Sequence, residues 1–296
     1  MTEPISDQLK RIAAAGDIGV ILHIGAGEGA ELAGYLAANA DHIRLMEPNP
    51  AAAAALQQIA AGVPTVQVDG RAVTGQDSVA VLHVFNLAPY SSLHAPRELA
   101  RMFPGLHVAS EPEVATIAVS SLMADIPFTR GRRNVLVLDA PGEEGNIVEA
   151  LRAGSWLHRF EHVFLYCGTS QLYQNSRTVK ELRDILESEG YRLAAMLEDD
   201  PDRPCLVLHV DLTARKVESL EHENRKLTAK VEQLLARNNE LETAQAHGDE
   251  QIAQMKELLA RNRKLEATQQ RLTGEMHRAE GQIELIKDLL LREVRL

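Results

Sequence analysis

Three glycines and one acid give the first indication of chemistry in this chain. Gly25, Gly27 and Gly29 follow the apolar run ILHI, and Glu47 comes 18 residues after the last of them. A glycine turn between a strand and a helix lets the backbone approach a ligand closely and points helix N–H groups at it. A carboxylate at the end of the next strand can accept hydrogen bonds from both hydroxyls of a ribose. This spacing predicts a site for a nucleoside-containing cofactor.

The glycine pattern by itself leaves the cofactor open. Spelled as Gly-x-Gly-x-x-Ala, with Gly25, Gly27 and Ala30, the turn also fits a dinucleotide, which would make the protein a nicotinamide-dependent enzyme. The glycines could also do no more than turn a strand into a helix. The elements around the turn have to decide between these alternatives.

Up to Asp211 the chain alternates short apolar runs with helical patterns, which is typical of a parallel sheet covered by helices on both faces. We therefore predict an α/β fold with a seven-stranded, doubly wound, Rossmann-like sheet. The predicted strands are 20–24, 43–47, 64–68, 134–139, 162–167, 191–197 and 204–210. The predicted helices are 4–15, 28–38, 50–61, 144–156 and 177–189.

Two connections in this pattern are unusual. The segment between Asp69 and Arg133 is far longer than a normal loop, and we expect it to act as a lid or a binding loop. The last two predicted strands are joined only by EDDPDRP, which is too short for a crossover helix. They must therefore form an antiparallel hairpin at the end of the sheet.

Several motifs, taken in order, resemble those of the FkbM-type S-adenosylmethionine-dependent methyltransferases. The motifs cover most of residues 18 to 211 and read GAGEG, MEPNP, NLAPYSSL, LVLDAPGEEGNIVEAL and LYQNSRTVKELRDILESEGYRL. A terminal antiparallel hairpin is also typical of the class I methyltransferase fold and not of the nicotinamide-binding fold. The resemblance implies S-adenosyl-L-methionine as the cofactor. It further implies O-methylation of a sugar, a glycan or another small hydroxylated metabolite.

The resemblance also implies roles for individual residues. Gly25, Gly27 and Gly29 would contact the methionine part of the cofactor, and Glu47 would bind the ribose. Asp139 would lie at the methyl-transfer end of the cleft.

Methyl transfer to oxygen requires alignment of the acceptor and removal of its proton. The candidates for the base are Asp139, His94 and Glu144. Ser91 and Ser92 stand beside His94, but the sequence places no orienting acid there, so we expect a substrate or cofactor loop and not a hydrolytic nucleophile. No cysteine or histidine spacing indicates a metal site.

Three departures from the family pattern affect the ligand side of the sheet. His23, a candidate cofactor-binding residue, replaces the acid that begins the glycine motif and helps to hold the cofactor's ammonium group. Pro141 replaces an acid two residues after Asp139, and Tyr166 stands where the fifth strand would end in an acidic residue. The alternative function is therefore a catalytically degenerate, methyltransferase-like scaffold. Its C-terminal part would set a distance or recruit a partner, in an assembly such as surface-polysaccharide machinery.

From residue 213 the sequence follows heptads. One core position holds Val217, Asn224, Val231 and Asn238, and the other holds Leu220, Leu227, Leu234 and Leu241. After AQAHGDEQ a second series runs through Met255, Asn262, Gln269, Met276, Ile283 and Leu290, with Leu258, Leu265, Leu272, Ala279 and Ile286 at the other position. The change of register equals an insertion of three residues, a stammer. Asn at the first core position with Leu at the second favours a parallel, two-stranded coiled coil.

We therefore predict a methyltransferase-like domain over residues 1–212 and a coiled-coil homodimerisation rod over 213–296. The final stretch, IELIKDLLLREVRL, has a broader apolar face. It could close the dimer or bind a second protein.

The charge distribution and the hydropathy exclude other partners. Residues 1 to 211 hold 16 Lys and Arg against 27 Asp and Glu, so the net charge of −11 lies on this part of the chain. An acidic domain disfavours nucleic acid, because nucleic-acid affinity comes largely from cations on phosphates. No apolar run reaches the length of a membrane span, and the N-terminus lacks the order of a signal peptide. These features predict a cytoplasmic protein.

Overall fold

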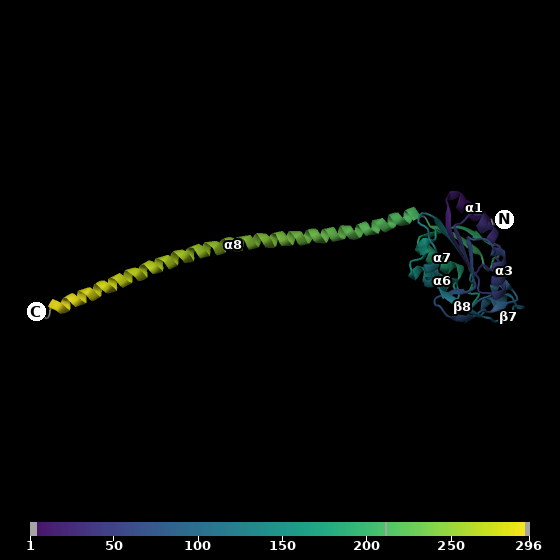
Figure 1. Ribbon diagram of the computed structural model, residues 1–296, viewed down its shortest axis with the longest axis horizontal. Helices are drawn as coiled ribbons and strands as arrows, with labels where there is room; N and C mark the ends of the chain where they lie inside the picture. The colour runs from purple at the N-terminus through teal and green to yellow at the C-terminus, as the bar shows by residue number, and fades with distance from the viewer. Residues whose placement is uncertain (1–4, 211, 294–296) are drawn as a thin grey trace. The chain divides into compact units, whose positions relative to one another are not determined.

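The structure is a computed structural model that describes residues 5–210 and 212–293 (Figure 1). Residue contacts divide the chain into two units, Met1–Val217 and Glu218–Leu296. The first unit holds all the described strands, and the second consists of the greater part of one helix, α8 (Leu212–Glu293). We describe each unit by itself.

The N-terminal unit is built on a seven-stranded sheet with the order β11-β12-β10-β9-β1-β2-β3. Every neighbouring pair is parallel except those of β12, which runs antiparallel to both β10 and β11. The strands are β1 (Ile18–Ile24), β2 (His42–Met46), β3 (Val66–Asp69), β9 (Arg133–Leu138), β10 (His162–Tyr166), β11 (Tyr191–Leu197) and β12 (Cys205–Val210). The predicted α/β sheet and its terminal antiparallel hairpin are confirmed.

Two apolar cores cover the two faces of this sheet. Successive residues of β1, such as Ile21 and Leu22, point into opposite cores, as strand geometry requires. One core is completed by α5 (Val119–Asp125), α6 (Glu144–Ala153) and α7 (Val179–Ser188), and the other by α1 (Ile5–Ala15), α2 (Leu32–Ala37) and α3 (Pro50–Ala60). Figure 1 shows α6 and α7 on one side of the sheet and α1 and α3 on the other.

Local signals account for where the helices begin. Asn49 caps α3 by accepting a hydrogen bond from the N–H of Ala51, and Pro50 is the first helical residue. Thr178 and Glu181 form a capping box at the start of α7. The prediction was wrong for the second helix, expected over 28–38, because α2 begins only at Leu32. Gly29 has a φ of +83°, which a right-handed helix cannot contain.

The long segment between β3 and β9 folds into small elements. They are β4 (Ala72–Thr74), β5 (Val79–Val81), β6 (Val84–Phe85), the 3-10 helix η1 (Ala88–Tyr90), α4 (Glu98–Met102), β7 (Val108–Ser110), β8 (Glu113–Ala118) and α5. Strand β8 joins β4 and β5 in one sheet, and β6 pairs with β7 in another. The Tyr173 hydroxyl donates a 2.6 Å hydrogen bond to the carbonyl of Tyr90. The insertion is therefore anchored to the loop that follows β10. A second 3-10 helix, η2 (Leu157–Arg159), precedes β10.

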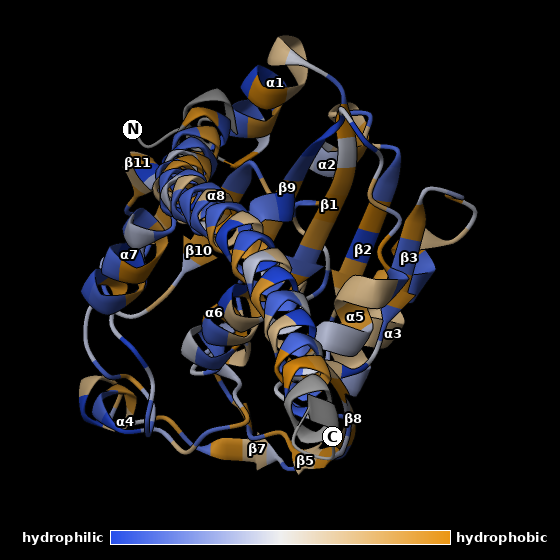
Figure 2. Cartoon of the chain, turned by 90° about the vertical axis from the view of Figure 1, so that its left-hand side faces the viewer, coloured by the Kyte–Doolittle hydropathy of each residue, from blue (hydrophilic) through white to orange (hydrophobic). Residues whose placement is uncertain are grey.

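Helix α8 runs without interruption through residues 244–251, where the heptad register changes. The large hydrophobic residues of the predicted seam that the structure describes, such as Leu227, Leu234 and Leu258, have half or more of their surface exposed. Figure 2 shows these hydrophobic positions recurring among hydrophilic ones along the helix. Leu290 and the broader apolar face beyond residue 287 lie outside the side chains that the structure describes. Within the second unit, taken by itself, the described apolar stripe of α8 is thus exposed.

Within residues 5–210 and 212–293, every helix is too short or too polar to cross a membrane.

Candidate functional site

A cavity of about 720 Å³ opens at the carboxyl ends of β1, β2 and β9. This position is the topological switch point of the sheet, because the chain leaves β1 toward β2 on one side and β9 flanks β1 on the other. Ligands bind at such points in open α/β sheets. The insertion supplies one wall through Ala88, Pro89 and residues 91–93. The predicted site and the predicted binding loop therefore meet.

The three predicted glycines serve different purposes. Gly25 has a φ of +86°, and a Cβ there would lie 1.8 Å from the carbonyl oxygen of Asp139. Gly27 has a φ of +55°, and a Cβ there would meet nothing within 4 Å. Both line the cavity, whereas Gly29 does not, since a Cβ on it would meet Leu56 of α3 at 2.5 Å. Gly29 thus packs closely against α3 and lies outside the cavity lining.

The turn uses its own N–H groups within the chain. The N–H groups of Gly25 and Ala26 donate to the carbonyl of Met46 at 2.8 and 3.0 Å, and Gly29 donates to Ala26 at 3.0 Å. The N–H of Gly27 donates to Oε2 of Glu47 at 2.7 Å. A dinucleotide-binding turn instead presents its N–H groups to a pyrophosphate. In this turn the N–H groups of Gly25, Ala26, Gly27 and Gly29 all donate within the chain, so none of these four is available to a pyrophosphate.

Glu47 sits directly after β2 and is nearly buried. Its Oε1 accepts a second hydrogen bond, of 2.8 Å, from the N–H of Asn49. Burial raises the pKa of Glu47, while the hydrogen bonds from Asn49 and Gly27 oppose that rise. An ionised carboxylate has about four acceptor sites, so both oxygens can still accept a ligand hydroxyl. The position and the remaining acceptor capacity suit the predicted ribose contact.

His23 lines the same cavity and is 2% exposed. Its Nδ1 lies 2.9 Å from the hydroxyl of Tyr35, on α2. Burial lowers the pKa of His23 to about 3, so the imidazole is neutral near pH 7. Its other ring nitrogen, Nε2, is buried and has no hydrogen-bond partner among the described residues.

Asp139 is not the free carboxylate that a base requires. It follows β9 and lines the cavity, but Oδ1 is ion-paired with Arg203, which comes from the turn before β12. Arg203 is buried and also donates a 3.1 Å hydrogen bond to the carbonyl of Pro89. Burial lowers the pKa of Arg203 to about 10, which still leaves it cationic at pH 7. The hydrogen bond to Pro89 ties the insertion to the hairpin, and the ion pair engages Oδ1 of Asp139.

Tyr166 stands where an acid was expected, at the end of β10, and its ring packs beneath the same guanidinium. The centre of the Arg203 guanidinium lies 5.9 Å from the Tyr166 ring and 6.0 Å from the Tyr90 ring. Such stacking favours a cation between two aromatic faces. Tyr90 also donates a hydrogen bond to Asp200. Tyr166, which stands in place of the expected acid, therefore packs against the Arg203 side chain.

Glu144, the third candidate base, is the first residue of α6 and is 3% exposed. It does not line the cavity. Burial raises the pKa of Glu144 to about 8, so the group is mainly protonated at neutral pH. A buried, neutral carboxyl lacks the ionised oxygen that a base needs, which favours the other candidates for this role.

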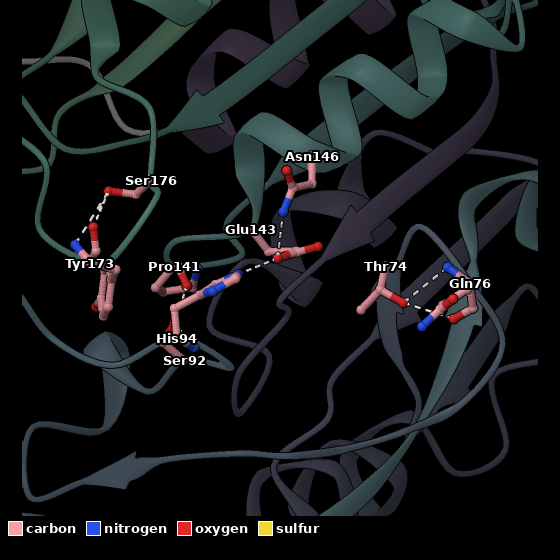
Figure 3. A network of polar contacts seen from close by, with 9 residues as sticks. All are labelled: Thr74, Gln76, Ser92, His94, Pro141, Glu143, Asn146, Tyr173 and Ser176. Carbon is pink, nitrogen blue, oxygen red and sulfur yellow. Dashed lines mark hydrogen bonds and ion pairs between the residues drawn. The ribbon is translucent and has the colours of Figure 1, made fainter.

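His94 has the surroundings of a base. Its Nε2 contacts Oε2 of Glu143, a cavity-lining residue, and Asn146 donates to the same oxygen at 3.0 Å (Figure 3). The Ser92 hydroxyl donates to the carbonyl of Pro141 at 2.5 Å and accepts from the N–H of His94 at 2.9 Å. Through these two hydrogen bonds Ser92 anchors the loop that carries His94. His94 itself is not among the residues that line the cavity, but its side chain is 25% exposed and its partner Glu143 does line the cavity.

The wall of the cavity is acidic. Its charged lining residues are Glu28, Glu31, Glu47, Asp139, Glu143 and Arg71. Arg71 is engaged by Asp69, whose Oδ2 accepts from it at 2.7 Å. Such a wall favours a cationic ligand over a polyphosphate. Among the described residues there is no cluster of three or more His, Cys, Asp and Glu side chains that could hold a metal ion.

Sequence reasoning identified neither Arg203 nor the contact of Glu143 with His94. The signal for Arg203 was present, because it is the only cation in the acidic turn EDDPDRP. That the arginine turns inward to Asp139 follows from packing and has no local signature. The link between His94 and Glu143, which are 49 residues apart, has none either.

Comparisons with known proteins give the following results. No protein-family model and no curated protein matches the chain. One similar structure is a protein from Streptococcus pneumoniae that is provisionally assigned as a tRNA (m1A22) methyltransferase and was solved in complex with S-adenosyl-L-methionine. It is 13% identical to this chain, and the match covers 71% of this chain and 73% of that chain with a TM-score of 0.37. An rRNA methylase from Streptococcus thermophilus is 13% identical, with a TM-score of 0.38 over 71% of this chain and 99% of that chain. A ribosomal protein L11 methylase from Lactobacillus delbrueckii subsp. bulgaricus is 9% identical, with a TM-score of 0.36 over 71% of this chain and 81% of that chain.

Proposed function

We propose that the chain is an S-adenosyl-L-methionine-dependent methyltransferase of FkbM type that methylates oxygen on a sugar or another small hydroxylated metabolite. One observation carries the choice of cofactor: the N–H groups of Gly25, Ala26, Gly27 and Gly29 are used within the chain, in a cavity whose wall is acidic. That wall suits a sulfonium cation, and the occupied N–H groups do not suit the pyrophosphate of a nicotinamide cofactor.

The residues present fit this cofactor. Glu47 would bind the ribose hydroxyls, and the open space at Gly27 would admit the ligand beside the turn. S-adenosyl-L-methionine, when bound, supplies a methyl group on a positively charged sulfur. The cavity volume of about 720 Å³ leaves room for a small acceptor beside it.

His94 is the base in this proposal. If its Nε2 carries the hydrogen that is donated to Glu143, its Nδ1 is free to accept a proton from the acceptor hydroxyl. The Glu143 carboxylate then stabilises the imidazolium that forms, and Asn146 holds that carboxylate in place. Positioned general bases of this kind contribute roughly 10²- to 10⁴-fold in rate.

The test is isothermal titration of the full chain with S-adenosyl-L-methionine. We expect saturable binding by the natural sequence and none by Gly27→Arg, whose side chain would fill the open space at the turn. NAD⁺ titrated under the same conditions should give no heat of binding. Absence of binding at millimolar S-adenosyl-L-methionine would contradict the proposal.

A second candidate function is supported by the engagement of Asp139 with Arg203 and by the exposed seam of α8. In this alternative the head is a methyltransferase-like scaffold, and the helix sets a distance or recruits a partner, as in surface-polysaccharide assembly. It would be favoured if cofactor binds without turnover against a broad panel of acceptors. Deletion of whole heptads should then abolish function in the cell without changing cofactor affinity.

We also propose that α8 pairs with α8 of a second copy in a parallel coiled coil. Charges beside the seam support this direction and register. In such a pair Lys216 would face Glu221 of the second copy, Arg237 would face Glu242, and Arg261 would face Glu266. Glu275 would face Glu280, so one like-charged pair opposes three attractive ones. Pairing would also cover the exposed leucines of the seam. The broader apolar C-terminal stretch remains a proposed contact for a further protein.

A further inference from the structure

His23 is a buried polar residue whose bonding is incomplete. Its Nδ1 is 2.9 Å from the Tyr35 hydroxyl, while its Nε2 has no partner among the described residues. The residue is 2% exposed and lines the candidate cofactor cavity. A buried donor or acceptor without a partner destabilises the structure, and a ligand group that bonds to it would remove that penalty.

The contact with Tyr35 decides which ring nitrogen carries the hydrogen. Tyr35 is 1% exposed, and His23 Nδ1 is the one partner found for its hydroxyl within the described part of the chain. Burial raises the pKa of Tyr35, so the phenol keeps its proton and must donate it. Nδ1 of His23 is then the acceptor. In a neutral imidazole the hydrogen must consequently reside on Nε2.

The protonated Nε2 makes this end of the cavity a donor. The family's acid at this position would attract the cationic ammonium of an amino acid. A neutral imidazole that offers an N–H attracts an oxygen acceptor instead. Arg71 is the lone cation among the lining residues that the structure describes, and it is engaged by Asp69. An anionic oxygen of a ligand would therefore depend strongly on the N–H of His23.

We propose that His23 donates a hydrogen bond from Nε2 to a carboxylate oxygen at the amino-acid end of the adenosyl ligand, and that Tyr35 positions the ring for this contact. The inference rests on the proposed cofactor. It changes the basis of recognition at this point from the ligand's ammonium group to its carboxylate.

The first test compares two ligands on the unmodified full chain. Decarboxylated S-adenosylmethionine keeps the sulfonium and the ammonium group but lacks the carboxylate. Isothermal titration should show that its affinity is at least roughly tenfold lower than that of S-adenosyl-L-methionine. This is the effect expected from the loss of one hydrogen bond to a charged group. Equal affinity for the two ligands would overturn this inference and leave the proposed function standing. Failure of both ligands to bind would overturn the proposed function and this inference together.

Two variants of His23 test whether the preference for the carboxylated ligand depends on this side chain. His23→Gln keeps an N–H donor near the position of Nε2, and His23→Leu removes it. We expect Gln to keep most of the preference for the carboxylated ligand, and Leu to bind both ligands with the same affinity. Thermal unfolding checks that each variant folds. A full preference retained in a folded His23→Leu would overturn the assignment.

The second test observes the ring hydrogen directly and needs no ligand. Nitrogen-15 chemical shifts of histidine side chains distinguish a protonated from an unprotonated ring nitrogen. For His23 we expect protonated Nε2 and unprotonated Nδ1 in the natural chain. In Tyr35→Phe, which assigns the signal, we expect Nδ1 to shift as it loses its donor. The opposite tautomer in the natural chain would overturn the inference.

Discussion

The backbone N–H of Gly27 donates a 2.7 Å hydrogen bond to Oε2 of Glu47. This contact joins the turn that follows β1 to the acid that follows β2, and both residues line the cavity. It consumes an N–H group that a pyrophosphate would need and orients a carboxylate that a ribose can use. The chemistry of the site is therefore set by how these two residues meet and not by the glycine pattern alone.

The two glycines of the cavity should tolerate a methyl group very differently. Gly25→Ala places its Cβ 1.8 Å from the Asp139 carbonyl, whereas Gly27→Ala meets nothing within 4 Å. Both alanines would also be strained, by about 1–2 kcal/mol each, by the left-handed conformation. We expect urea unfolding to show a loss of about 1–2 kcal/mol for Gly27→Ala and about 3 kcal/mol or more for Gly25→Ala. Equal losses would contradict the packing described for Gly25.

Glu47→Gln should weaken cofactor binding roughly tenfold or more, because an amide has one oxygen where the carboxylate receives two N–H groups. Titration with S-adenosyl-L-methionine measures the change. Glu28→Gln is the matched control, since it removes the same charge from an exposed lining residue. Similar effects of the two variants would indicate that overall charge, and not the geometry at Glu47, controls binding.

Glu144 should make stability depend on pH. Its pKa is raised from 4.5 to about 8 in the folded chain, so the unfolded chain loses this proton first as the pH rises. The resulting stabilisation is complete below about pH 4.5 and is lost progressively toward pH 8. Glu144→Gln removes this dependence.

The measurement for Glu144 is the difference in free energy of unfolding between the natural chain and Glu144→Gln, from urea titrations between pH 4.5 and 9. We expect the variant to gain relative stability as the pH rises, by on the order of a few kcal/mol. Taking the difference cancels the other titrating groups, including His23. A difference that does not change with pH would show that Glu144 is not held protonated.

His94 should carry the proton transfer. We expect His94→Gln to lower kcat by roughly 10²-fold or more while the affinity for S-adenosyl-L-methionine stays unchanged. Glu143→Gln should cause a smaller loss, because it weakens the support of His94 and leaves the imidazole in place. Asp139→Asn is the comparison, and its main effect should be on stability, since it leaves the buried Arg203 without its ion pair. A variant of His94 with full kcat would assign the base elsewhere.

The seam of α8 should hold two copies together. Light scattering on the full chain should give twice the mass of one chain. The double variant Leu227→Glu and Leu234→Glu should give the mass of one chain, because it places charges at two neighbouring core positions. Gln233→Glu together with Ala236→Glu adds the same charge on the outer face and should leave the dimer intact. A natural chain that is monomeric at tens of micromolar would refute the pairing.

The sequence by itself determined where the seven strands of the main sheet lie along the chain, the terminal hairpin and the heptads of α8. These features rest on local periodicity and on connection length, as with EDDPDRP, and neighbouring residues alone specify them. The position of Glu47 and the cavity-lining places of Gly25 and Gly27 followed from the same spacing. The late start of α2 did not, because it depends on the left-handed conformation of Gly29.

The tertiary structure alone decided which candidates can act. Asp139 is engaged in an ion pair with Arg203, which is distant in the sequence. Glu144 is neutral because the core closes over the start of α6, and His94 gains Glu143 because the insertion packs on the end of β9. Burial and contacts between remote segments set protonation and access. No pattern of neighbouring residues encodes them.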